Sequence, residues 1–267
     1  MEQDLRDALA ADDLFLNFQP KLDLQSGRVV GAEALVRWYH EGRGMVSPGL
    51  FIPVAEEAGL ITAITDVVLR KVCQQIREWL DAGLPTPRIS LNLSPADFKR
   101  ENLKDVVQSA YENAGINPMY LELEITEGMA MGMSEDITEF LNEMRSLGIR
   151  IAIDDFGTGY SSMAYLSRFP IDSLKIDQTF VRNIVTDSDS ANITTAIIHL
   201  AQSLQVDVVA EGVEDEQQYE FLRERGCTEI QGFWISRPVH ATGFMDFLLK
   251  HNAAVEAEGP LLSQHSG

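Results

Sequence analysis

The sequence predicts an α/β fold, a TIM-like (β/α)8 barrel whose first strand runs antiparallel to the others. About eight short apolar strands alternate with helical segments, which is typical of parallel strand pairing. The chain has 267 residues, which matches the roughly 250 residues of such barrels. The first two predicted strands are joined by a turn around Gly27 that is too short for a parallel crossover, so the first strand should be antiparallel. An open doubly wound sheet is the alternative fold.

The individual elements follow from periodicity and from turn residues. Residues 14–19 alternate in polarity and then meet Pro20, which predicts a strand that ends there. Ser47 and Pro48 suit the N-cap and the first position of a helix. Apolar side chains recur at helical spacing over residues 61–80, before Gly83. The other strands are expected at residues 29–36, 88–93, 120–125, 149–153, 173–176, 206–210 and 228–230.

The chain is predicted to form one domain, because no Pro-rich or Ser-rich linker divides it. We expect the barrel to span residues 12–252. Residues 1–11 are expected to be an N-terminal lead-in or connector. The small, polar residues 253–267 are expected to be a disordered C-terminal tail.

The composition excludes several classes of partner. The formal net charge of −20 argues against DNA binding, which needs a basic surface, and against contact with an anionic membrane. No apolar run approaches the roughly 20 residues of a membrane span. The acidic N-terminus does not resemble a secretory signal. Two distant cysteines, Cys73 and Cys227, indicate reduced core residues of a cytosolic protein.

The stretch Arg150 to Ser162, RIAIDDFGTGYSS, places two carboxylates where a buried strand enters a loop. Gly157 and Gly159 permit a tight turn after Asp154 and Asp155. Adjacent carboxylates repel each other unless a cation neutralises them, and Mg²⁺ or Mn²⁺ would suit oxygen ligands. A solvated loop with two surface aspartates is the alternative interpretation of this stretch alone.

Polar residues end nearly every predicted strand, at the side of a barrel where active sites are built. For one strand alone, a polar loop residue would be the simpler interpretation, but the repetition favours a shared site. These residues are Glu33, Asn92, Glu122, Glu124, Glu127, Asp154, Asp155, Lys175, Asp177, Glu211, Glu214 and Gln231.

The residue types indicate phosphate chemistry with hard cations. Glu33, Asn92, Glu124 and Asp154 offer only oxygen, which suits Mg²⁺ or Mn²⁺ rather than Zn²⁺. With Asp155 there are enough carboxylates for two ions that share a ligand, an arrangement suited to displacement at phosphorus. Among the remaining polar residues, Arg37 could grip a phosphate, Lys175 should stay protonated among carboxylates, and Glu211 is a candidate base or further ligand.

An ordered set of motifs resembles the EAL-domain phosphodiesterases of bacterial cyclic di-GMP signalling. Glu33-Ala34-Leu35 opens EALVRW, preceded by Gln19-Pro20-Lys21 and followed by FIPVAEE. The segments NLS, EITE, DDFGTGYSS, LKID, AEGVE and QGF then follow in order. The resemblance covers roughly residues 12 to 250, and it is the ordered set rather than EAL alone that is specific.

The resemblance implies hydrolysis of cyclic di-GMP to linear pGpG with two Mg²⁺ or Mn²⁺ ions in a barrel with an antiparallel first strand. The implied roles are these: Glu33, Asn92, Glu124 and Asp154 bind one ion; Asp154 and Asp155 bind the second; Lys175 and Glu211 are catalytic and handle water; Gln19, Leu35, Arg37 and Gln231 contact substrate; and Glu127 steadies the Asp155–Ser162 loop.

The resemblance also implies partners and a location. Family members often form homodimers through the loop at Asp155–Ser162 and neighbouring helices. They are usually fused to an upstream sensory or GGDEF domain. The expected location is the bacterial cytoplasm, within a full-length protein that membrane segments elsewhere could anchor.

Three other functions are weighed against hydrolysis. The first is a non-catalytic cyclic di-GMP receptor, which would bind the nucleotide without releasing pGpG. The second is a barrel enzyme in which Lys175 forms a Schiff base, which the acids nearby in sequence disfavour. The third is an interaction module, which would not need acids on every strand.

Overall fold

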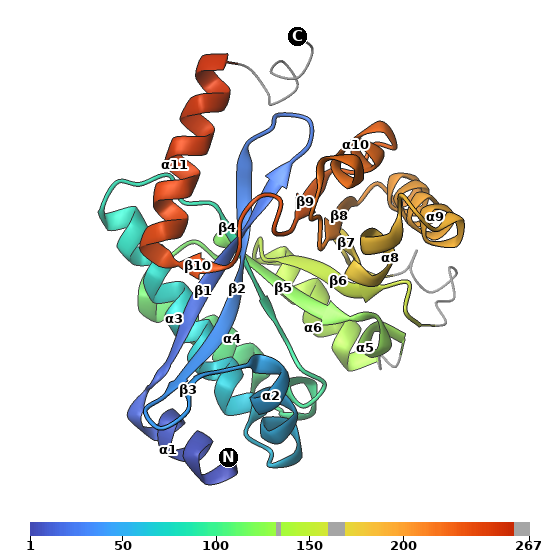
Figure 1. Cartoon of the computed structure of the whole chain (residues 1–267). Coiled ribbons are helices and arrows are strands. Elements are labelled where there is room, and N and C mark those ends of the chain that lie inside the picture. The colour runs from blue at the N-terminus through green and yellow to red at the C-terminus, as the bar shows by residue number, and fades with distance from the viewer. Residues whose placement is uncertain (132–134, 160–168, 259–267) are drawn as a thin grey trace.

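A closed barrel forms the centre of the computed structural model, which describes residues 1–131, 135–159 and 169–258. Within these ranges ten strands form one sheet in the order β10-β1-β9-β8-β7-β6-β5-β4-β2-β3, and an additional pairing of β1 with β2 closes eight of them into the barrel (Figure 1). The strands are β1 (Leu14–Asp23), β2 (Val29–His40), β3 (Gly44–Val46), β4 (Arg88–Asn92), β5 (Leu121–Thr126), β6 (Arg150–Phe156), β7 (Ser173–Ile176), β8 (Asp207–Glu211), β9 (Glu229–Gln231) and β10 (Val239–His240).

Strand β1 runs against its neighbours, as the short turn predicted. It pairs antiparallel with β2 and with β9, whereas β2, β4, β5, β6, β7, β8 and β9 pair in parallel. The turn is closed by a hydrogen bond from the Asp23 amide to the Arg28 carbonyl, and Gly27 adopts a φ of 71° there. The barrel prediction, including the antiparallel first strand, is therefore confirmed.

Helices cover the outside of the barrel, so that the strands are buried on both faces. The α-helices of the described residues are α1 (Glu2–Ala11), α2 (Pro48–Glu57), α3 (Ile61–Asp81), α4 (Leu103–Ala114), α5 (Glu127–Met131), α6 (Glu135–Ser146), α8 (Gln178–Asn183), α9 (Ser188–Leu204), α10 (Glu216–Glu224) and α11 (Ala241–Glu258), with 3-10 turns η1 (Asp97–Lys99) and η2 (Pro118–Tyr120). None of these helices is both long and apolar enough to cross a membrane.

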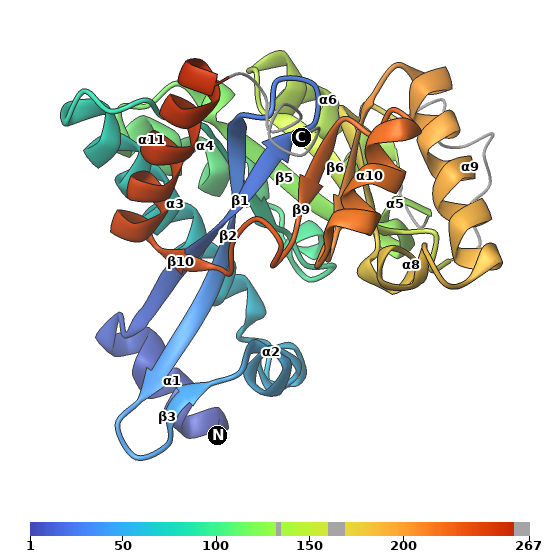
Figure 2. The same cartoon turned by 45° about the horizontal axis from the view of Figure 1, so that its top comes forward.

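The N-terminal segment belongs to the folded body. Helix α1 lies with β3 and α2 beyond the end of the barrel at which β2 finishes (Figure 2). Its Leu5 and Ala8 are buried in the apolar core. The expected lead-in is thus a packed helix.

The C-terminal helix is longer than expected. The sequence predicted disorder from residue 253, but α11 continues through Glu258, so this prediction is wrong for residues 253–258. Near the end of the helix, the Asn252 side chain accepts from the Val29 amide at 2.8 Å and donates to the Val29 carbonyl at 3.2 Å. This contact to the first hairpin gives the last turns a tertiary partner that local polarity could not reveal. Residues 259–267 lie outside the described part of the chain.

Candidate functional site

The ammonium group of Lys175 lies at the centre of four carboxylates that come from four other strands. Its Nζ is 2.5 Å from Glu124 Oε2 on β5, 2.7 Å from Glu211 Oε1 on β8, 3.1 Å from Asp154 Oδ1 on β6 and 3.6 Å from Glu33 Oε2 on β2. Because these strands are parallel and Lys175 is wholly buried, their polar residues meet inside one mouth of the barrel. The structure thus brings together acids that lie up to 178 positions apart in the chain, from Glu33 to Glu211.

Asn92 completes the predicted set of oxygen donors on the side of β2. It is the last residue of β4 and lies in register with Glu124 on β5. Its Nδ2 donates a hydrogen bond to Glu33 Oε1 at 2.8 Å. Glu33, Asn92, Glu124 and Asp154 therefore lie in one cluster, as required if they are to share an ion.

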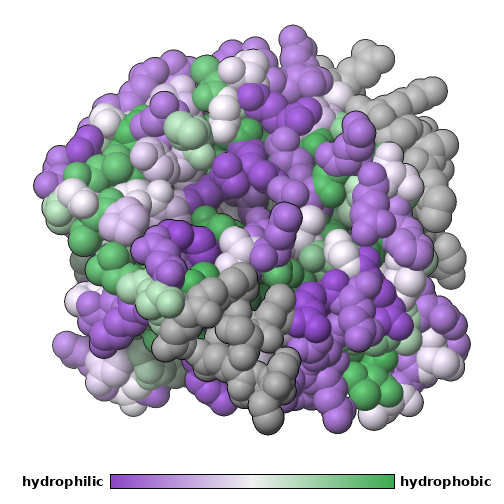
Figure 3. All heavy atoms as spheres, turned by 90° about the horizontal axis from the view of Figure 1, so that it is seen from above, coloured by the Kyte–Doolittle hydropathy of each residue, from purple (hydrophilic) through white to green (hydrophobic). Residues whose placement is uncertain are grey.

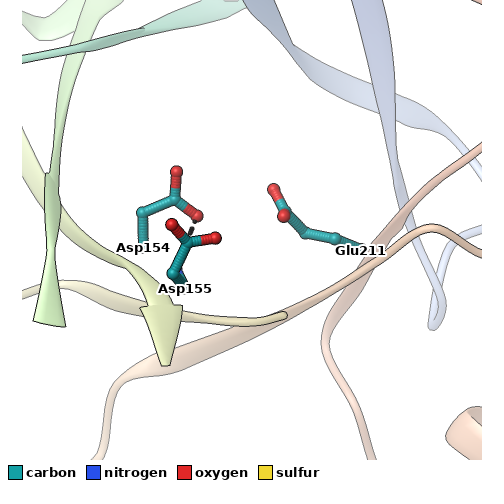
Figure 4. A group of neighbouring side chains, drawn as sticks. All are labelled: Asp154, Asp155 and Glu211. Carbon is teal, nitrogen blue, oxygen red and sulfur yellow. Dashed lines mark hydrogen bonds between the residues drawn. The ribbon is translucent and has the colours of Figure 1, made fainter. Parts of the chain in front are cut away.

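The backbone at Asp155 turns two neighbouring carboxylates to the same side. Consecutive side chains of a strand normally point to opposite faces, but Asp155 has a left-handed φ of 54°, a conformation that aspartate tolerates better than most residues. The β6–β7 register also shifts between Ile153 and Phe156. As a result, Asp154, Asp155 and Glu211 offer carboxylate oxygens that all lie within 4.8 Å of one another (Figure 4).

Burial and charge set the protonation of the cluster in opposite directions. Burial raises the pKa of Glu211 to about 8, although Lys175 opposes the rise. Burial and the adjacent Asp154 raise the pKa of Asp155 to about 6. For Glu124 the two lysines outweigh burial and lower the pKa to about 2. Burial would lower the pKa of Lys175, but the surrounding carboxylates raise it well above its usual value. A protonated Lys175 therefore sits among acids, as the sequence predicted.

Gln231 borders the acids and carries an unused acceptor. Its Nε2 donates to Glu33 Oε2 at 2.7 Å and to Gln19 Oε1 at 3.1 Å. Its Oε1 is buried and has no hydrogen-bond partner among the described residues. A buried polar atom of this kind normally finds a partner, so it suits a water or ligand group. Gln19 and Gln231 thus lie side by side next to Glu33; their expected contact with substrate stays a prediction.

A cavity of about 260 Å³ opens beside the cluster. Gln19, Glu33, Leu35, Asp154, Glu211 and Gln231 line it, together with residues that the sequence prediction did not select for contact: Gln178, Gly212, Glu214, Gly232, Phe233 and Pro238. A larger groove of about 470 Å³ between α3 and α4 has none of the clustered acids around Lys175 in its lining. The smaller cavity is the candidate site because it alone, of these two, reaches the charged cluster.

Arg37 lies outside the lining of the cavity. It follows Leu35 on the same face of β2 and is half-buried, but it does not line the cavity. Its Nη1 donates to the neighbouring Val36 carbonyl at 2.9 Å. The structure therefore brings Leu35 to the cavity wall and leaves Arg37 beyond it.

Glu127 contacts the loop that follows Asp155. Its Oε2 accepts hydrogen bonds from the Gly157 amide at 2.8 Å and from the Gly159 amide at 3.3 Å. A Cβ at residue 159 would lie 2.8 Å from Glu127 Oε1, so glycine permits this approach. Residues 160–162 of the predicted dimer loop lie outside the described residues.

Lys21 is the main polar residue near the cluster to which sequence reasoning gave no role. It lies on β1, two residues after Gln19, and its Nζ donates to Glu124 Oε1 at 2.9 Å. The period of two along a strand places Lys21 and Gln19 on one face. That alternation was the available signal, but the strand was predicted to end at Pro20, whereas β1 continues through Asp23.

Comparison with known proteins gives a consistent family. The EAL domain model matches residues 2–238. Two curated relatives from Pseudomonas aeruginosa are the bifunctional diguanylate cyclase/cyclic di-GMP phosphodiesterase MucR, 44% identical over 238 residues, and the cyclic di-GMP phosphodiesterase NbdA, 43% identical over 263 residues. The matches cover 89% and 98% of this chain but only 35% and 33% of those proteins, so the chain spans about a third of their length.

Solved structures show the same likeness in three dimensions. A PaMucR phosphodiesterase in complex with c-di-GMP is 43% identical, with a TM-score of 0.87, and the match covers 91% of this chain and 98% of that one. The cGMP-bound EAL enzyme Bd1971 is 31% identical with a TM-score of 0.86, over 92% of this chain and 68% of the other.

Proposed function

This chain belongs to the EAL domain family, and from that premise we propose that it is a metal-dependent phosphodiesterase that hydrolyses cyclic di-GMP to linear pGpG. The observation that carries the proposal is the cluster of Glu33, Glu124, Asp154 and Glu211 around Lys175, with Asp155 beside it. Relatives named as cyclic di-GMP phosphodiesterases support the choice of substrate.

The donor set fits Mg²⁺ or Mn²⁺. Glu33, Asn92, Glu124 and Asp154 would hold one ion, and Asp154 with Asp155 would hold the second. These ligands are carboxylate or amide oxygens, which hard divalent cations prefer. When bound, two such ions supply an activated water and stabilise charge on the attacking and leaving oxygens.

The chain's own residues would handle the proton and the substrate. Glu211 borders the cavity and has a pKa near 8, so it can exchange a proton close to neutral pH. Lys175 keeps its charge and can donate hydrogen bonds to a water or phosphate oxygen. The unpaired Oε1 of Gln231 can orient a water or a substrate donor. Leu35 offers an apolar wall beside the acids, and Arg37 would contact a part of the substrate that extends beyond the cavity.

Glu127 would keep the second ion's ligand in place. It binds the amides of Gly157 and Gly159 just after Asp155.

We extend the proposal to a homodimer through the Asp155–Ser162 loop, to an upstream sensory or GGDEF domain and to a bacterial cytoplasmic location. The name of the relative MucR, a bifunctional diguanylate cyclase/cyclic di-GMP phosphodiesterase, supports the proposed upstream domain.

Hydrolysis tests the proposal directly. The purified chain is incubated with cyclic di-GMP and Mg²⁺ or Mn²⁺, with and without chelator, and pGpG is followed by chromatography. We expect pGpG only when the cation is present. Asp154→Asn should lower the rate at least about 100-fold, because even outer partners of metal ligands cost about 10- to 100-fold when removed.

The exposed Asp105 on α4, distant from the acids, provides the matched control. Asp105→Asn makes the same chemical change and should leave the rate unaltered. Binding of cyclic di-GMP without pGpG release would instead support a non-catalytic receptor. Equal turnover with chelator would contradict the metal-dependent mechanism.

A further inference from the structure

Lys21 is a buried cation for which the proposed reaction has no direct use. Its side chain is only 3% exposed, in the interior of the barrel beneath the acids. Its Nζ lies 2.9 Å from Glu122 Oε1 and 2.9 Å from Glu124 Oε1. Desolvating an ammonium group is costly unless it is paired well, and Glu122 and Glu124 supply that pairing.

Each of the two carboxylate oxygens of Glu124 is held by a different lysine. Lys21 binds Oε1 from below, and Lys175 binds Oε2 at 2.5 Å from the side of the site. Glu124 is 0% exposed. Charge-assisted hydrogen bonds are short and directional, so the two lysines together set the rotation of the carboxylate about its last bond.

We propose that Lys21 is a positioning residue for cation binding: by holding Oε1 of Glu124, it keeps Oε2 turned toward the position that Glu33 and Asp154 share. This inference rests on the proposed function, because it takes Glu124 to be a ligand of the cation. Lys21 itself touches neither substrate nor ion.

Alternating charges continue below Lys21, on the side away from Glu124. Glu122 Oε2 is 3.3 Å from Arg150 Nε, and Arg150 Nη2 is 2.5 Å from Asp207 Oδ2. Arg150 and Asp207 are the first residues of β6 and β8, so this series runs from the site toward the end of the barrel that carries the β1–β2 turn. There, hydrophilic side chains gather around a hollow in the surface (Figure 3).

Gly31 of β2 lies opposite Lys21 of β1 in the barrel. A Cβ at this position would lie 3.8 Å from both Cβ and Cδ of Lys21 and 3.2 Å from the Arg88 carbonyl oxygen. The backbone φ of Gly31 is not in the left-handed region, so conformational freedom does not explain the glycine. The tight neighbour of such a Cβ would be the Arg88 carbonyl oxygen on β4, whereas 3.8 Å from Lys21 is an ordinary van der Waals contact.

The experiment must separate the effect of Lys21 on the orientation of the Glu124 carboxylate from the effect of the lysine's positive charge on cation binding. Replacing Lys21 alone also removes a positive charge that repels the cation, and this would favour binding. The double variant Lys21→Met/Glu122→Gln removes one positive and one negative charge together. The matched control Arg150→Met/Glu122→Gln makes the same change in net charge but keeps Lys21 on Glu124.

The measured quantity is the dissociation constant of Mn²⁺ without nucleotide, from the electron paramagnetic resonance signal of free Mn²⁺. The Lys21 double variant should bind Mn²⁺ about 10- to 100-fold more weakly than the parent, and the Arg150 double variant about as tightly as the parent. Hydrolysis by the Lys21 variant should recover when Mn²⁺ is raised above the weakened constant, which loss of the fold would not allow.

Equal dissociation constants for the two double variants would overturn the inference. A Lys21 double variant that fails to fold by circular dichroism would also overturn it, because Lys21 would then serve the fold itself. Failure of the parent chain to bind Mn²⁺ is distinguishable from both, because it would overturn the proposed function together with this inference.

Discussion

Two glutamates inside the barrel have pKa values shifted in opposite directions by their surroundings. Lys175 and Lys21 bracket Glu124, so its pKa falls to about 2 although burial opposes the fall. Glu229 lies at the start of β9, and burial raises its pKa to about 7 because Lys21 offsets only part of the cost. The same residue type is therefore a permanent anion at one position and a titrating group at the other.

Glu229 should make stability depend on pH. Its pKa in the folded chain is about 7, above the ordinary glutamate value of 4.5, so between these values the folded chain binds a proton that the unfolded chain releases. The contribution of this proton to stability is complete below about 4.5 and is lost as pH rises through about 7. We expect Glu229→Gln to raise the free energy of unfolding at pH 8 by about 2 kcal/mol, with little change at pH 4.5.

Urea unfolding across this pH range measures the effect. Glu101→Gln, at an exposed glutamate, is the control and should leave the pH profile unchanged. A Glu229→Gln profile parallel to that of the parent would contradict the prediction.

Helix α1 illustrates what an element contributes beyond its own sequence. Ten residues are too few for a stable isolated helix, yet Leu5 is 0% exposed and Ala8 is buried beside it. The C-cap residue Asp12 has a left-handed backbone conformation, which a glycine would adopt more readily. Packing against the rest of the molecule therefore stabilises this helix.

Leu5→Ala should lower the free energy of unfolding by about 2–5 kcal/mol, because it leaves a cavity in a closed core. Chemical denaturation of the purified variant measures the loss. Gln3→Ala changes an exposed position of the same helix and should stay within about 0.5 kcal/mol of the parent. If Leu5→Ala changed the free energy of unfolding as little as Gln3→Ala, α1 would not unfold cooperatively with the barrel.

The molecule as a whole is strongly acidic, and the cluster holds part of that charge in the interior of the barrel. The chain carries a net charge of −20, and the cluster places Glu33, Glu124, Asp154 and Glu211 around a single lysine. Lys21 also pairs with Glu124, but the two lysines cannot neutralise all four carboxylates. A divalent cation bound to the folded state alone should therefore stabilise the entire fold.

Mn²⁺ at about 100 times its dissociation constant should raise the free energy of unfolding by about 2.7 kcal/mol. Thermal unfolding with Mn²⁺ and with chelator measures the shift independently of hydrolysis. Asp154→Asn removes the ligand that both proposed ions share, so most of the shift should disappear. An identical midpoint for the parent chain under both conditions would argue against a cation site.

Much of the fold and of the site could be predicted because local patterns carry that information. Apolar runs that end in Glu33, Asn92, Glu124 and Asp154 marked both the strands and the oxygen donors. Prediction was poorer where one local signal was overlooked. Residues 253–258 read AAVEAE, and the expectation of disorder disregarded the helix preference of Ala and Glu, with which they continue α11.

The sequence by itself determined the strand–helix alternation, the antiparallel start and the kind of atom available at each strand end, because each depends on neighbours within a few residues. Only the tertiary structure decided that Lys175 stands among four acids, that Asp155 turns with a φ of 54° and that Lys21 reaches Glu124. These features depend on distances between atoms on strands far apart in the chain, and closure of the barrel sets those distances.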